Sequence, residues 1–235
     1  MIRSSVLALV AALACGVLGC LPPLASLGHV IPATSPYPWA THLADYKKGN
    51  WVRYRLESAG SAIETWIAVV GESGGNLWIH VGTSLGTFEY DHVLCVEPSV
   101  RKVVKAYYSD TVFHQRGKDK VWWSCDIKVS PAAQTGDACP MCGKAHKAPD
   151  VNVSEARVRV GDKDLPCKKA DVTAHLCDGK EARTTSFFSN EVPRLFDLSG
   201  LSEHGGLVRF EGSGVKITLV GFGTNGLPMH DFPWE

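Results

Sequence analysis

The sequence of 235 residues has no excess of charge of either sign. Lysine plus arginine number 24 and aspartate plus glutamate also number 24, so the formal net charge at pH 7 is +0. Proteins that bind nucleic acid through its phosphates carry a basic surplus, and so do polybasic membrane-surface proteins. The balance argues against both classes, and we expect no nucleic-acid partner.

Signatures of catalysis and of long helices are also missing. The chain has no Gly-x-Ser-x-Gly elbow around a nucleophilic serine and no glycine-rich loop that opens a helix to cradle phosphate. It has neither heptads nor internal repeats. Apolar residues still make up 45% of the chain, which is enough to build a core. We therefore expect a folded protein that is not an enzyme and acts by binding.

Charged residues are absent from positions 4–44, and the start of this region has the pattern of an export leader. The apolar run at 6–14 follows Arg3 and is too short to span a bilayer, whereas a cleaved signal needs only about 7–15 apolar residues. Val17-Leu18-Gly19-Cys20 resembles the bacterial lipobox, whose cysteine is lipidated and becomes the mature N-terminus. An ordinary secretory signal is the alternative.

These features predict three segments: a signal peptide at 1–19, a lipidated Cys20 with a proline-rich tether at 20–44, and a β domain at 45–235 that includes a cysteine-containing loop at 131–149. The stretch 21–38 holds five prolines and no charge, so it should stay extended. We expect an exported protein of the bacterial cell envelope, anchored by lipid to a membrane, the outer membrane being favoured.

The body of the chain has the pattern of strands. Val52, Tyr54 and Leu56 alternate with two arginines, which is the period of a half-buried strand. Gly-rich residues 71–76 and the Asp-Gly within 177–180 predict hairpin turns. Further strands are expected at 65–70, 77–81, 87–96, 103–108, 121–127, 156–160, 169–175, 182–188, 207–211 and 216–222, and short helices at 39–48 and 191–201.

The predicted fold class is therefore mainly β, with one large twisted antiparallel sheet that forms a half-open or closed barrel and carries few short helices. A two-sheet sandwich is the alternative. In the strand at 87–96 the neighbours Asp91 and His92 should point to opposite faces, because successive side chains of a strand alternate.

Motifs near both ends of the body suggest a family. They are the opening stretch at 46–55, the Val-Pro step at 192–193, the Gly-Gly-Leu-Val-Arg stretch at 205–209 and a last strand ending on Gly-Thr at 223–224. Their order resembles bacterial envelope proteins similar to the LolA/LolB-like lipoprotein-carrier group. The resemblance implies a half-open barrel whose concave face holds acyl chains, so the implied partner is an apolar ligand, a lipid, a lipoprotein or another envelope component.

Six cysteines remain beside the leader and the anchor, and an even number in an exported protein suggests disulfides. The disulfide candidates are Cys95, Cys125, Cys167 and Cys177. Cys95 and Cys125 lie on separate predicted strands, while Cys167 and Cys177 flank the strand that enters the Asp-Gly hairpin.

The pair Cys139-Pro140-Met141-Cys142 admits three interpretations. It can be a local loop staple, a zinc knuckle with His146 as a third ligand and Cys125 or Cys167 as a fourth, or a redox pair. A second knuckle is missing and Gly143 leaves little room for a helix, so we rank the staple first, zinc second and redox third. No cofactor is expected, zinc being the alternative, and the alternative function is a thiol or zinc-binding protein centred on this pair.

Overall fold

The computed structural model describes residues 30–32, 45–111, 115–116, 119–128, 148–175, 179–196 and 202–226. The predicted signal peptide, Cys20, most of the tether and the cysteines of the loop at 131–149 lie outside this part of the chain, so the predicted division into segments stays a prediction. Among the described residues, no helix is both long enough and apolar enough to cross a membrane.

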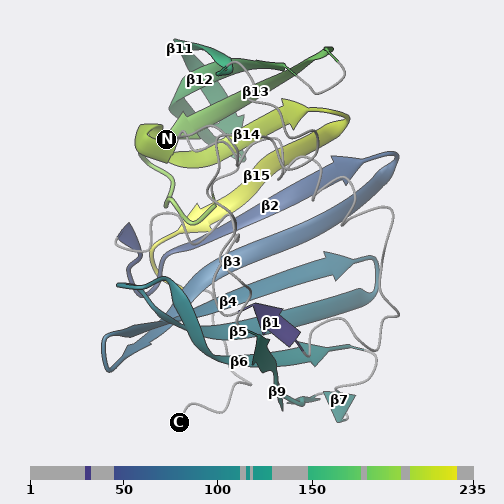
Figure 1. Ribbon diagram of the computed structural model, residues 1–235, viewed down its shortest axis with the longest axis vertical. Coiled ribbons are helices and arrows are strands. Elements are labelled where there is room, and N and C mark those ends of the chain that lie inside the picture. The colour runs from purple at the N-terminus through teal and green to yellow at the C-terminus, as the bar shows by residue number, and fades with distance from the viewer. Residues whose placement is uncertain are drawn as a thin grey trace.

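Eleven strands form one large antiparallel sheet, which confirms the predicted fold class (Figure 1). The order across the sheet is β11-β12-β13-β14-β15-β2-β3-β4-β5-β6-β9, and within the described residues no pairing joins β11 to β9, so the sheet is not closed. Its strands are β2 (Trp51–Ser58), β3 (Ser61–Ser73), β4 (Asn76–Leu85), β5 (Phe88–Glu97), β6 (Lys102–Asp110), β9 (Trp123–Ser124), β11 (Asp150–Val160), β12 (Lys163–His175), β13 (Glu181–Ser189), β14 (Gly206–Gly212) and β15 (Val215–Gly223).

Two small strand pairs stand apart from this sheet. β1 (Val30–Pro32) runs parallel to β10 (Asp126–Lys128), and β7 (Gln115–Arg116) pairs with β8 (Asp119–Lys120). Helix within the described residues is limited to a 3₁₀ turn at Ser202–His204 and to Asp45, which also has 3₁₀ geometry. The helix predicted at 191–201 does not form over its described part, residues 191–196, because Pro193 interrupts it, and Val192, Leu195 and Phe196 pack into the main cluster instead.

The alternation that predicted the first strand is confirmed in β2. Val52, Tyr54 and Leu56 are buried, while Arg53 and Arg55 are exposed. The predicted hairpin turn between β3 and β4 is also confirmed, because Gly74 and Gly75 both adopt positive φ (60° and 80°), where an L side chain is disfavoured.

The two faces of the sheet bear different apolar clusters. The core face carries the main cluster, which draws buried side chains from β2 to β6 and from β11 to β15. The reverse face carries a small cluster of Trp78, Val93 and Cys95. Two buried tyrosines of the main cluster tie distant segments together, because the hydroxyl of Tyr54 donates to the carbonyl of Leu207 (2.9 Å) and that of Tyr46 to the carbonyl of Leu195 (3.0 Å).

Candidate functional site

A row of aromatic side chains lines one end of the core face, and we call it the aromatic row: Phe88, Tyr90, His92 and Tyr108. The first three occupy alternate positions of β5, so they share a face, and Tyr108 lies opposite His92 on β6. Ring centroids along the row are 5.9 Å, 6.1 Å and 5.1 Å apart in that order. Burial falls along the row from the buried Tyr108 to the half-buried residues of β5.

A buried carboxylate, that of Asp110, contacts this row. Asp110 lies opposite Tyr90 in the strand register and is itself buried. Burial raises the pKa of Tyr108 well above its ordinary value, and the charge of Asp110 and a hydrogen bond to it raise that pKa further. The Tyr108 hydroxyl therefore stays protonated and holds its ring in place as a donor. The row is a fixed apolar surface whose polar tips can still accept or donate hydrogen bonds.

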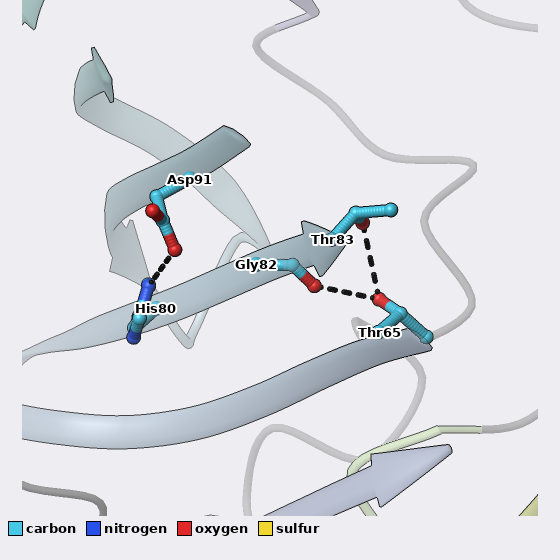
Figure 2. A network of polar contacts seen from close by, with 5 residues as sticks. All are labelled: Thr65, His80, Gly82, Thr83 and Asp91. Carbon is cyan, nitrogen blue, oxygen red and sulfur yellow. Dashed lines mark hydrogen bonds and ion pairs between the residues drawn. The ribbon is translucent and has the colours of Figure 1, made fainter. Parts of the chain in front are cut away.

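The reverse face carries a buried hydrogen bond between His80 and Asp91, which we call the His80–Asp91 pair. The ring Nε2 of His80 donates to Oδ1 of Asp91 over 2.6 Å (Figure 2). His80 lies directly opposite Val93, so Asp91 is its diagonal neighbour on β5. The other ring nitrogen of His80, Nδ1, is buried and has no hydrogen-bond partner among the described groups. The prediction that Asp91 and His92 point to opposite faces is confirmed, since His92 belongs to the aromatic row.

The indole of Trp66 packs against the His80 ring of this pair. Its ring meets the His80 ring edge-on at a centroid distance of 6.1 Å. Gly82 lies opposite Trp66 in the register, and a Cβ at Gly82 would overlap the indole. The glycine is therefore required by the close approach of the ring, which seals one side of the pair from water.

Two threonines link β3 and β4 on the core face near the aromatic row. Thr65 donates its hydroxyl to the carbonyl of Gly82 (2.9 Å), and Thr83 donates to the Thr65 hydroxyl (3.3 Å), as Figure 2 shows. Thr83 lies directly opposite Tyr90. Both hydroxyl groups beside the aromatic row thus donate their hydrogens within the protein. Toward a ligand they can accept a hydrogen bond but not donate one.

Three of the disulfide candidates, Cys95, Cys125 and Cys167, are buried in the structure. Cys95 belongs to the cluster on the reverse face, whereas Cys125 belongs to the core face. Cys167 belongs to the main cluster through β12, near the other end of the sheet. The fourth candidate, Cys177, lies outside the described residues, so the disulfide pairing of these cysteines stays a prediction.

The remaining site predictions also fall outside the described residues. Cys139, Cys142 and His146 are among them, so the staple, zinc and redox interpretations all stay predictions. Within the described part of the chain, no group of three or more His, Cys, Asp or Glu side chains is placed to hold a metal. Burial raises the pKa of Cys125 to about 12 and that of Cys167 to about 11, so both thiols are protonated at neutral pH.

Sequence reasoning missed the partnership of His80 with Asp91 and the aromatic row. His80 lies inside an apolar run, where alternation gives no signal. The spacing of Phe88, Tyr90 and His92 at every second residue was visible in the sequence and, with a strand predicted there, could have revealed a shared face.

Comparison with known proteins assigns this chain neither a family nor a function. No protein-family model matches the chain, and no curated protein matches it. Among solved structures the chain resembles MucB with 13% identity and a TM-score of 0.39, over 82% of this chain and 60% of MucB. It also resembles a DUF1329 family protein from Desulfovibrio piger with 11% identity and a TM-score of 0.25, over 82% of this chain and 95% of that one. Likeness this low carries no argument about function.

Proposed function

We propose that this protein is a lipid-anchored binding protein of the bacterial cell envelope that holds an apolar or acyl ligand on the core face of its sheet. The observation that carries the proposal is the aromatic row on the core face of a sheet that does not close on itself. The proposal assigns the chain no catalytic step.

The chemistry of the row suits an amphipathic ligand. The half-buried rings of Phe88 and Tyr90 extend the main apolar cluster toward solvent, because Tyr90 packs directly against that cluster. Val81 and Ile63 on neighbouring strands are also partly buried and pack against it. An acyl chain can lie on these side chains, while the tyrosine hydroxyl meets a polar head group at the boundary with water.

The predicted leader supports the location. A lipidated Cys20 followed by an extended, proline-rich tether would keep the domain close to a membrane that contains acyl ligands. A tethered domain suits a receptor better than a soluble shuttle. This part of the proposal depends on the lipobox and on the resemblance to the lipoprotein-carrier group, and on no similarity to a solved structure.

Binding of the fluorescent fatty acid cis-parinaric acid to the delipidated protein tests the proposal. We expect Val81→Glu to weaken binding by about tenfold or more, because a carboxylate would have to lose water against the acyl chain. Val220→Glu is the matched control, because Val220 is an exposed valine outside both clusters. Equal affinity of the two variants, or no saturable binding by the unmodified protein, would contradict the proposal.

A further inference from the structure

The outer edge of β11 has no partner among the described residues, and it lacks several of the usual protections of an edge strand. β11 pairs with β12 on one side and ends the sheet on the other, as the uppermost strand of Figure 1. Its eleven residues include no proline, glycine or lysine. Val151 and Val153 expose 46% and 42% of their surface. Long, regular edges of this kind pair readily with another strand.

We propose that a second copy of this chain pairs antiparallel with β11, so that the two sheets continue into one. The proposal concerns the rim of the sheet and is independent of ligand binding on the core face. A two-fold axis through such a pair sets each residue opposite its mirror position along the strand, and the axis residue opposite itself. The charges of β11 then select the register.

Centring the axis on the midpoint of the strand would place Glu155 opposite Glu155 of the second copy. Like charges directly opposite each other on a strand pair are destabilising. A shift of the axis by one residue, to Ala156, removes this repulsion. Glu155 then lies opposite Arg157 of the second copy, and the same contact occurs again across the axis. Residues 152–160 of both copies remain paired in this register.

The existing ion pairs extend this complementarity. Lys168 is already paired with Glu155, and Arg157 with Asp164 at 2.6 Å. The side chains of Glu155 and Arg157 are 75% and 64% exposed, so both can reach across the edge. In the proposed register, charges of alternating sign follow one another from Lys168 through Glu155 to Arg157 and Asp164 of the second copy, twice by symmetry.

The opposite side of the strand is compatible with the same register. Ala156 faces itself at the axis, where a small side chain leaves the two backbones free to approach. Ser154 lies opposite Val158 of the second copy, and Asn152 opposite Val160. Val158 and Val160 already contact the main cluster, so the second copy would cover their outer side.

Charge reversal tests the proposal in the full chain, with sedimentation equilibrium as the measurement. We expect the unmodified protein to dimerise, and Glu155→Arg or Arg157→Glu alone to weaken the dimer by about tenfold or more, because each puts like charges opposite each other twice. The double variant E155R/R157E restores opposite charges and should recover the dimer. Arg183→Glu on β13 is the matched control, because Arg183 is similarly exposed and lies away from the edge.

Circular dichroism of each variant separates loss of pairing from loss of fold. A single variant that unfolds is replaced by the charge-neutral Glu155→Gln and Arg157→Gln, which should weaken the dimer less than reversal. An unmodified chain that is monomeric at every concentration measured would overturn the proposal. So would a dimer that both single reversals leave unchanged, or one that the double variant fails to restore.

Discussion

Raising the pH from 8 to 10 under reducing conditions should destabilise the fold through two buried thiols. Cys125 and Cys167 expose only 7% and 2% of their surface. Burial raises the pKa of Cys125 from an ordinary value of 9.0 to about 12, with a smaller contribution from the charge of Asp126. Burial likewise raises the pKa of Cys167 to about 11, although a backbone hydrogen bond from Val158 opposes the shift.

The sign of the effect follows from these directions. Both pKa values are higher in the folded than in the unfolded chain, so the protonated thiols contribute a stability that is complete below about pH 9 and decreases as the pH rises toward 11 and 12. At pH 10, about one unit above the ordinary pKa of a thiol, ionisation favours the unfolded chain by about 1.4 kcal/mol per thiol, or about 3 kcal/mol for the two. The free energy of unfolding of a single domain is only about 5–15 kcal/mol in total.

Urea unfolding at pH 8, 9 and 10 with a phosphine reductant measures this loss. The free energy of unfolding should fall by about 3 kcal/mol more in the unmodified chain than in the double variant C125A/C167A. Cys95 and the buried tyrosines, whose pKa values are also raised, are the same in both proteins, so their ionisation cancels in the comparison. An equal fall in both proteins, or none in the unmodified chain, would refute the conclusion that burial raises the pKa of these two thiols.

Substitutions at two sites and one measurement on the unmodified chain have further expected outcomes. Asp91→Ala should lower the free energy of urea unfolding by about 1–3 kcal/mol, because it removes the acceptor of a buried ring nitrogen of His80; adding His80→Phe should recover part of the loss, and full additivity of the two changes would contradict the pairing. Gly82→Ala should cost about 1–3 kcal/mol and alter tryptophan fluorescence, because the new methyl group displaces Trp66; an unchanged spectrum would show that the ring does not lie there. Mass spectrometry of the mature N-terminus should find an acylated Cys20, and an unmodified chain starting elsewhere would remove the predicted anchor.

The sequence predicts the strands best where one face is buried and the other is exposed. β2 shows this, because its buried Val52 and Tyr54 alternate with exposed arginines. The hairpin predicted from the Asp-Gly sequence is a second case. β12 and β13 pair antiparallel, and Gly179 between them adopts a φ of 82° that few other residues tolerate.

Prediction fails where alternation is absent. The first residues of β11, 150–155, are exposed on both faces, so no apolar period marks them as a strand. β12 begins before its predicted start and contains Pro166, which lacks an amide donor and argues locally against a strand. In both strands the pairing in the folded sheet overrides the local signal, and Pro166 lies opposite Arg157 in a continuous register.

The His80–Asp91 pair could not be predicted from the local sequence pattern, because it depends on how two strands are aligned. The two residues are eleven positions apart, and only the register of the β4–β5 hairpin makes them diagonal neighbours. A shift of that register by one residue would put the two side chains on opposite faces. The strands could be predicted, but their relative alignment could not.

The strand order also has a consequence for how the chain folds. β2 to β6 and β11 to β15 are two meanders in which each strand pairs with its neighbour in sequence, and the pairing of β2 with β15 joins them, as in Ser58 with Val215. Synthesis from the N-terminus, and the export proposed for this chain, deliver β2 early and β15 late. Until β15 arrives, the first meander has an unpaired edge at the position that later becomes the middle of the sheet. If the chain is exported as proposed, slow export would prolong this exposure, and we expect the yield of folded protein to depend on chaperones that shield unpaired strands.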